Sequence, residues 1–342
     1  MKGIEVRRSS SLPSVNRRTF LVATVGAILR VRVVEAQGEV TQPVLSEADC
    51  PLEIITPTAS DGHRGLGVLR KPPGRGPFPA IIYLHGGITT VPIASLRSTA
   101  KDGANPSRFL AAGYVVVVPT YRSRDIDPQS SVSLEDALAM VEFVRRLPYV
   151  DSESIVVFGC SGGGDLALEV ATRTRICVVI PEEPASVLMS GLMNSSVPKK
   201  GERYTPGAGF FMLENPARYY TPEFQKFLRA KIAKIQCPIL IVQGSVDRPD
   251  VPINKFNAEV LIPELRAAKK TLEVRTYAGQ GHCFFAGSGV PRPSGQPTRA
   301  GETPVALEAF RDIDTFCRRY LRTQPKEIDS ALVTHVPVRT SW

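Results

Sequence analysis

The feature that most constrains this chain is a serine at position 161, set between a predicted strand and a predicted helix. Residues 154–158 read Ser-Ile-Val-Val-Phe, a run typical of a buried strand, and residues 159–163 read Gly-Cys-Ser-Gly-Gly. The apolar pattern of a helix follows at 165–171. A strand that leads through Gly-x-Ser-x-Gly into a helix strains the serine backbone and exposes its hydroxyl above the sheet. The sequence therefore predicts a nucleophile at Ser161 rather than a helix-capping residue.

Strand and helix patterns alternate along most of the 342 residues. An antiparallel pair is expected around a turn at 60–62, and near-continuous apolar runs follow, typical of strands buried on both faces of a parallel sheet. These runs lie at 80–84, 114–118, 155–158, 177–180 and 238–242, and a further strand is expected at 272–277. Helices are expected at 106–112, 134–147, 254–268 and 305–320. The alternation predicts an α/β fold with a doubly wound, mostly parallel sheet.

Three segments depart from this alternation. Residues 182–234 carry Met, Gly and Pro clusters and predict a small cap insertion, the alternative being a long crossover with extra helices. The pattern weakens beyond Arg322, so we interpret 37–323 as one domain and 324–342 as a C-terminal tail. Residues 1–36 are the third segment.

Residues 1–36 resemble a twin-arginine export signal. Residues 16–21 read Asn-Arg-Arg-Thr-Phe-Leu, a short apolar stretch follows, and 34–36 offer a small-residue cleavage site. We expect export to the periplasm or beyond by the twin-arginine machinery, or a cytoplasmic protein if this segment is only a basic tail. No stretch of the sequence predicts a membrane-spanning helix, so we expect no stable membrane insertion.

The charge and the cysteine content limit which partners and cofactors the chain is expected to bind. The net charge is +9, but residues 1–36 contain seven of the 42 basic and two of the 33 acidic residues, which leaves +4 for the rest. This balance does not indicate nucleic-acid binding. The six cysteines match no zinc-binding spacing and the four histidines are widely separated, so we expect no metal and no cofactor. The spacing assigns no disulfide pairing.

A serine nucleophile needs a base to take its proton, and that base needs an orienting acid. Asp247 and His282 each lie in the first loop after a predicted core strand. Loops at the carboxyl ends of parallel strands meet at one edge of the sheet. The predicted catalytic residues are therefore Ser161, Asp247 and His282, with Asp250 as the alternative acid.

An oxyanion hole needs two N–H donors. One is expected from Gly162, at the start of the helix after the serine. The other is expected from Gly86 or Gly87, in the loop that follows the strand at 80–84. We interpret His85, next to these glycines, as a structural hydrogen-bonding residue rather than a base.

Six short stretches together resemble the catalytic domain of the prolyl oligopeptidase (S9) and dienelactone-hydrolase-like group of α/β-hydrolases. They are Tyr-Leu-His-Gly-Gly at 83–87, Pro-Thr-Tyr-Arg-Ser at 119–123, Pro-Tyr-Val-Asp at 148–151, the 159–163 motif, Gly-Ser-Val-Asp at 244–247 and Gly-His at 281–282. The resemblance covers roughly residues 50–322. It implies an α/β-hydrolase fold with an eight-stranded sheet and the same Ser161, Asp247 and His282 triad.

We therefore expect a serine hydrolase that cleaves small carboxylic esters through an acyl-enzyme. The alternative is an S9-type serine peptidase acting on short peptides, and a distant alternative is a non-catalytic binding protein with a hydrolase fold. Exopeptidases of the group grip a substrate amine with acidic residues. Glu182 and Glu183 could take that role, but we interpret them as a solvated charge pair. Cys160 is expected to point away from the substrate.

Overall fold

A computed structural model gives the structure of most of the chain between Thr41 and Pro337. The described residues are 41–87, 89–123, 132–186, 189, 216, 220–247, 252–286 and 303–337. The expected export signal, Asp250 and much of the expected cap lie outside these residues, so the interpretations given to them stay predictions.

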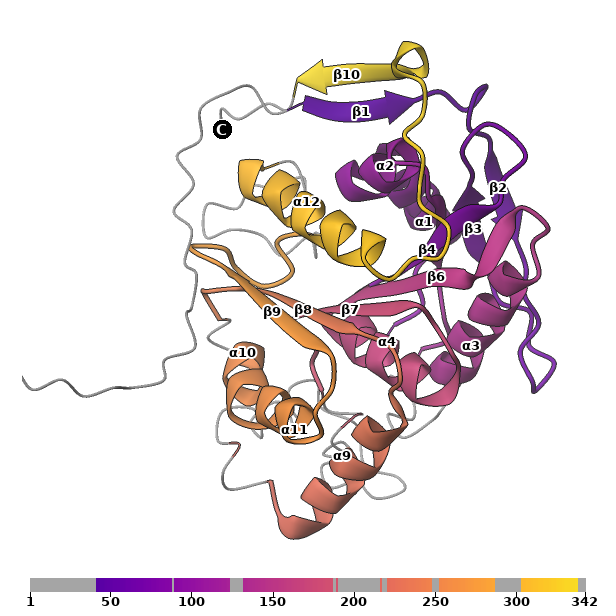
Figure 1. Cartoon of the computed structure of the whole chain (residues 1–342). Helices are drawn as coiled ribbons and strands as arrows, with labels where there is room; N and C mark the ends of the chain where they lie inside the picture. The colour runs from indigo at the N-terminus through magenta and orange to yellow at the C-terminus, as the bar shows by residue number, and fades with distance from the viewer. Residues whose placement is uncertain are drawn as a thin grey trace, which may run out of the picture. The chain divides into compact units, whose positions relative to one another are not determined.

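Eight strands form one sheet in the order β2-β3-β5-β4-β6-β7-β8-β9 (Figure 1). They are β2 (Leu52–Ile55), β3 (Gly67–Arg70), β4 (Phe78–Leu84), β5 (Val115–Pro119), β6 (Val150–Cys160), β7 (Val178–Glu182), β8 (Ile239–Gly244) and β9 (Leu272–Tyr277). The pairs β2–β3 and β3–β5 are antiparallel, and every other neighbouring pair is parallel. The eight-stranded, mostly parallel sheet is confirmed, including the antiparallel pair at its beginning.

Alternate residues of the central strands face two different apolar cores. Ile82 and Leu84 of β4 pack in one core, and Ile81 and Tyr83 pack in the other. This follows from the two-residue repeat of a strand, and it explains why the strands read as continuous apolar runs. Figure 1 shows α3 and α4 on one side of the sheet and α1, α2 and α12 on the other.

The helices supply the outer layers of both cores. On the first side they are α3 (Val132–Arg145), α4 (Gly162–Arg173), α9 (Pro222–Lys234), α10 (Ile253–Phe256) and α11 (Ile262–Ala267), with a π-helical segment (Asn257–Leu261) between the last two; on the second side they are α1 (Ile93–Asp102), α2 (Ala104–Ala111) and α12 (Pro304–Arg318). The single helix expected before β5 is thus preceded by another, α1, and the two are divided at Gly103.

The two ends of the described chain pair with each other outside the main sheet. Strand β1 (Thr41–Leu45) runs antiparallel to β10 (Val333–Pro337), which follows a short 3-10 turn (Ser330–Leu332). The segment interpreted as a C-terminal tail therefore contains a strand. In the part of the chain that the structure describes, no helix has the length and hydropathy that crossing a membrane requires.

The parallel strands bring the predicted site residues to one edge of the sheet. Leu84 lies opposite Gly159, Cys160 opposite Glu182, and Gly244 opposite Tyr277. The loops that leave β4, β6, β7, β8 and β9 therefore begin side by side at the carboxyl ends of these strands.

Candidate active site

Ser161 occupies the sharp turn between β6 and α4. Its φ of 53° and ψ of −115° lie in a region that residues other than glycine rarely adopt. Its N–H donates to the Glu182 carbonyl at 2.9 Å, and its carbonyl accepts from Asp165 N at 3.0 Å and Ala185 N at 3.1 Å. The strand, strained serine and helix expected from the sequence are all present, and β7 and the residues after it hold the turn in place.

Glycines are required on both sides of this serine. A Cβ atom on Gly159 would overlap the carbonyl of Gly163, and one on Gly162 would overlap the carbonyl of Gly87. The backbone segments therefore approach more closely than any side chain would allow. This packing explains the motif and brings the loop after β4 against the start of α4.

The expected oxyanion glycines surround Ser161. A Cβ atom on Gly86 would lie 3.7 Å from the Ser161 Cβ and 3.3 Å from the Cys160 sulfur. Gly162 is the first residue of α4, where free N–H groups and the helix dipole favour negative charge. Gly87 has a φ of 76° and packs against Gly162. The glycines thus pack close together beside Ser161, and the role of their N–H groups as an oxyanion hole stays a prediction.

His85 supports this loop. Its ring stacks on Tyr121 with centroids 4.1 Å apart, and its Nδ1 lies 2.9 Å from the Gly86 carbonyl oxygen. The Tyr121 hydroxyl donates to the His85 carbonyl. Burial lowers the pKa of His85, which favours the neutral ring. These contacts agree with a structural role.

His282 lies in the loop after β9, and its side chain is only 6% exposed. Its Nδ1 lies 3.0 Å from Oε2 of Glu183, a fully buried residue directly after β7. Glu183 has a φ of 42°, a second strained position at this edge. The structure thus places a carboxyl group where a catalytic histidine needs its orienting acid.

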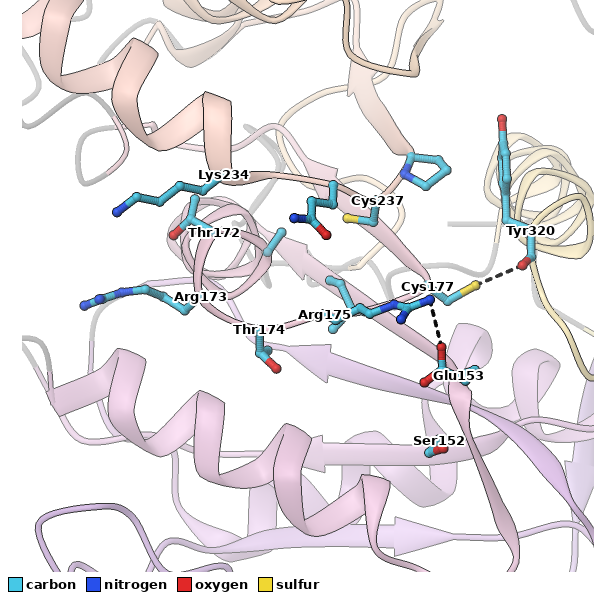
Figure 2. A pocket seen from close by; sticks show the side chains of 14 residues that line it. Ser152, Glu153, Thr172, Arg173, Thr174, Arg175, Cys177, Lys234, Cys237 and Tyr320 are labelled. Atoms are coloured by element: carbon cyan, nitrogen blue, oxygen red, sulfur yellow. Dashed lines mark hydrogen bonds and ion pairs between the residues drawn. The ribbon is translucent and has the colours of Figure 1, made fainter.

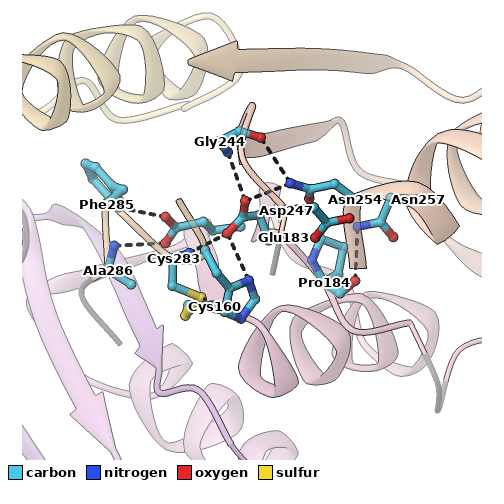
Figure 3. A network of polar contacts seen from close by, with 12 residues as sticks. Cys160, Glu183, Pro184, Gly244, Asp247, Asn254, Asn257, Cys283, Phe285 and Ala286 are labelled. Atoms are coloured by element: carbon cyan, nitrogen blue, oxygen red, sulfur yellow. Dashed lines mark hydrogen bonds and ion pairs between the residues drawn. A yellow bond between two sulfur atoms is a disulfide. The ribbon is translucent and has the colours of Figure 1, made fainter. Parts of the chain in front are cut away.

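Three further donors hold the Glu183 side chain (Figure 3). Oε1 accepts from Gly244 N at 2.9 Å and from Asn254 Nδ2 at 3.0 Å, and Oε2 also accepts from the backbone N–H of Cys283. With Nδ1 of His282, four nitrogen atoms therefore surround the two oxygens of Glu183. The end of β8 therefore holds the Glu183 side chain in place. Glu183 in turn holds the loop of residues 278–286, which contains His282 and is called the histidine loop below.

Asp247, the acid predicted from the sequence, lies just after β8. Its Oδ2 accepts from the backbone N–H of Lys255 at 3.0 Å. Asp250 lies outside the described residues. The choice of Asp247 as the orienting acid stays a prediction, and the structure adds Glu183 as a candidate that the sequence analysis did not include.

The expectation that Glu182 and Glu183 form a solvated pair is wrong. Both side chains are fully buried. They follow a buried strand that neighbours the Ser161 strand, so water does not reach them and protein donors take its place. The signal that could have found them is two consecutive acids at the carboxyl end of a buried parallel strand.

Glu182 anchors the histidine loop further along. Its two oxygens accept from Phe285 N at 2.7 Å and from Ala286 N at 2.8 Å. Burial, together with the neighbouring Glu183, raises the pKa of Glu182 to about 8. The consecutive glutamates thus hold consecutive parts of one loop.

A disulfide joins Cys160 to Cys283 across 123 residues, with the Cα atoms 5.9 Å apart. These cysteines are the residue before Ser161 and the residue after His282. The other four cysteines are free thiols (Cys50, Cys177, Cys237 and Cys317). The structure therefore connects the serine and the histidine through the sulfur atoms of their neighbours.

The family model of the prolyl oligopeptidase family (Peptidase S9) matches residues 102–298, more than half of the chain. The chain belongs to this family. Its matched region contains Ser161, Glu183, Asp247 and His282. Membership makes this chain a hydrolase of the serine esterase and peptidase type.

Individual relatives agree with this assignment. The uncharacterized peptidase YtmA of Bacillus subtilis is 24% identical, over 66% of this chain and 84% of its own length. Human acyl-coenzyme A thioesterase 6 is 26% identical, over 73% of this chain and 62% of its own length. Carboxyl esterase 2 of Tuber melanosporum superposes with a TM-score of 0.55 at 20% identity, covering 82% of this chain and 90% of that structure. This likeness shows that the family member has the α/β-hydrolase fold.

Among the residues that the structure describes, two overlapping sets of side chains have ligand atoms close enough to hold a metal ion. They are Cys160, Glu182 and Cys283, and Glu183, His282 and Cys283. In this structure the two sulfur atoms are bonded to each other, and the glutamate oxygens accept N–H bonds. The donors are therefore engaged in holding the histidine loop of this family member.

A pocket of about 640 Å³ lies at the amino ends of β7 and β8 (Figure 2). Its charged residues include Arg175, which pairs with Glu153 at 3.0 Å. Its thiols are weakly acidic, because burial raises the pKa of Cys177 to about 11 and that of Cys237 to about 12. It lies at the edge opposite Ser161, so the parallel strands separate it from the candidate catalytic residues.

Proposed function

We propose that this chain hydrolyses carboxylic esters through an acyl-enzyme, with Ser161 as nucleophile, His282 as base and Glu183 as orienting acid. The observation that carries the proposal is the 3.0 Å contact between His282 Nδ1 and Glu183 Oε2 at the edge that carries the strained serine. The pairing sets the tautomer: with the Nδ1 proton donated to Glu183, Nε2 keeps a lone pair that can accept a proton.

In the first half of the reaction, Nε2 of His282 takes the Ser161 proton as Oγ attacks the ester carbonyl. The carbonyl oxygen becomes negatively charged. The N–H of Gly162 and an N–H from Gly86 or Gly87 stabilise this charge. The imidazolium then gives its proton to the leaving alcohol, and the acyl group stays on Ser161.

In the second half, His282 takes a proton from water, which attacks the acyl-serine carbonyl. The same N–H groups stabilise the second oxyanion, and the imidazolium returns the proton to Ser161 as the acid product leaves. Glu183 stabilises the imidazolium in both halves without taking its proton.

The contacts of the two glutamates support an ester substrate over a free-amine peptide. The oxygens of Glu182 and Glu183 accept N–H groups of the protein itself. They are therefore not directed at a substrate amine. The structural likeness to a carboxyl esterase that aligns over most of both chains points the same way.

A panel of short p-nitrophenyl esters and aminoacyl p-nitroanilides tests the proposal. We expect higher kcat/KM for the esters, stoichiometric labelling by a fluorophosphonate, and loss of both in Ser161→Ala. Faster anilide cleavage would favour the peptidase alternative. A wild-type protein with neither turnover nor labelling would favour the binding-protein alternative.

We also propose that residues 1–36 direct export and are removed after Ala36. The disulfide between Cys160 and Cys283 supports this location, because such bonds persist in oxidising compartments. N-terminal sequencing of the protein recovered from the periplasm tests it. Gln37 as the first residue is the expected result, and an intact Met1 contradicts cleavage.

A further inference from the structure

The Cys160–Cys283 disulfide lies where the three parts of the proposed active site meet. Cys160 precedes the nucleophile in the chain, and Cys283 follows the base. The Cys283 sulfur lies 3.5 Å from Nε2 of His282. A Cβ on Gly86, in the oxyanion loop, would lie 3.3 Å from the Cys160 sulfur. The disulfide therefore lies next to the proposed nucleophile, the proposed base and the loop of the expected oxyanion hole.

We propose that this disulfide positions His282 relative to Ser161 for catalysis, so that a dithiol reductant turns hydrolysis down. The proposal rests on the ester hydrolase function proposed above. Cys160 and Cys283 act by positioning their neighbours: the Cys283 sulfur lies against Nε2 of His282, but neither sulfur forms or breaks a bond during hydrolysis.

The other contacts of the histidine loop show why a bond is needed at this point. Glu183 accepts from Cys283 N, and Glu182 accepts from Phe285 N and Ala286 N. Asn105 Nδ2 also donates to the Phe285 carbonyl. These contacts tie the loop to β7 and α2. Phe285 also packs edge-on against Phe158 of β6, with ring centroids 5.5 Å apart. The disulfide adds a covalent link from this loop to the residue directly before Ser161.

The backbone at Ser161 and Cys283 also indicates that surrounding contacts hold these two residues in place. Ser161 and Cys283 both have a φ of 53°, a strained value for residues other than glycine. Strained positions persist when surrounding contacts determine them; Cys283 is part of the disulfide, and Ser161 follows its other cysteine in the chain. Displacement of a catalytic group by about 1 Å can cost on the order of 100-fold in rate.

The reduction involves two electrons. A dithiol such as dithiothreitol breaks the bond between the Cys160 and Cys283 sulfurs and closes its own two sulfurs into a cyclic disulfide. Its two protons and two electrons convert both cysteines to thiols. After the dithiol is removed, oxidised glutathione re-forms the bond by accepting the two electrons and two protons and leaving as two glutathione thiols, so the effect on hydrolysis should be reversible.

The test compares oxidised and reduced wild-type protein with p-nitrophenyl acetate as substrate. Thiol titration of the denatured chain confirms the state, with four thiols when oxidised and six when reduced. Circular dichroism sets an assay temperature well below the melting midpoint of both forms. We expect reduction to lower kcat at least about tenfold, with KM changed less than about threefold, and reoxidation to restore kcat.

The double variant Cys160→Ser/Cys283→Ser gives the same measurement without a reductant. We expect its kcat to match that of the reduced wild type and not to respond to dithiol. Cys177→Ser is the matched control, because this thiol is free and lies in the pocket at the opposite edge of the sheet. It should respond to dithiol as the wild type does.

A bond that only stabilised the fold would lower the melting midpoint and leave kcat of the folded protein unchanged. Folded, reduced protein with six thiols and kcat within about twofold of the oxidised form would overturn the proposal, as would a change confined to KM. Oxidised wild type without turnover or fluorophosphonate labelling would instead contradict the ester hydrolase function.

Discussion

The two edges of the central sheet use similar residues in different ways. The carboxyl edge holds Glu182 and Glu183 fully buried with several donors each, a disulfide, and strained backbone at Ser161. The amino edge also holds a glutamate and two cysteines around its pocket. There Glu153 and Arg175 form an ion pair whose side chains are 41% and 78% exposed, and the cysteines form no disulfide.

This difference shows what marks the site. The pocket at the amino edge has the volume to hold a small molecule, but its charged groups are solvated and its cysteines are weakly acidic. At the carboxyl edge, buried acids and strained residues would be costly unless other contacts fixed them. Groups fixed in this way are preorganised, which is what catalysis requires.

Equivalent serine substitutions at the two edges give the largest expected contrast. Ser161→Ala removes the proposed nucleophile, and we expect kcat for a p-nitrophenyl ester to fall by at least about 10⁴-fold. Ser152→Ala changes an exposed residue of the other pocket, and kcat should stay within about twofold. Comparable losses in both variants would remove the distinction between the edges.

The pH dependence of stability gives the next contrast. Burial and the adjacent Glu183 raise the pKa of Glu182 from its ordinary value of 4.5 to about 8. Between these values the folded chain binds more protons at this group than the unfolded chain does. The contribution of Glu182 to the free energy of unfolding therefore falls as pH rises from 4.5 to about 8, by on the order of 5 kcal/mol, and is level above pH 8.

Urea denaturation of wild type, Glu182→Gln and Glu153→Gln across this pH range measures that contribution. Glu182→Gln should flatten the decline, whereas Glu153→Gln, at the solvated edge, should leave it unchanged. A wild-type profile that rises from pH 5 to pH 8, with the same slope in Glu182→Gln, would show that the group does not hold its proton in the folded state.

The sequence predicted the features of the carboxyl edge that are encoded locally. The turn at Ser161 was predictable because its strand, glycines and helix are consecutive, and the loop of Gly86 and Gly87 because it follows an apolar strand. The mostly parallel direction of the sheet followed from alternating strand and helix patterns, and its eight strands followed from a family resemblance, whereas the strand order was not predicted.

The contact of the proposed orienting acid, Glu183, and the pairing of the disulfide were not predictable from local sequence patterns. Glu183 contacts His282 from 99 positions away, and this depends on how β7, β8 and β9 pack together. Cys160 and Cys283 are separated by 123 residues, and six cysteines allow many pairings. A sequence pattern indicates that a residue follows a strand, but the partner of its side chain is determined by tertiary packing.

The smallest expected effect lies at the amino edge. Arg175→Ala removes the exposed ion pair with Glu153, and we expect the free energy of unfolding to fall by less than about 1 kcal/mol. Thermal or urea denaturation at low and high salt checks this value. A loss of several kcal/mol, or a loss of ester hydrolysis, would mean that this edge is more closely coupled to the site than its exposure indicates.

The kcat values of Glu183→Gln and Asp247→Asn test the central claim most directly. Each change removes a charge with little change in size. If Glu183 orients His282, Glu183→Gln should lower kcat by about 10²- to 10⁴-fold while Asp247→Asn changes it by less than about tenfold, both variants remaining folded by circular dichroism. The reverse ranking, a large loss in Asp247→Asn and near-normal kcat in Glu183→Gln, would contradict the account.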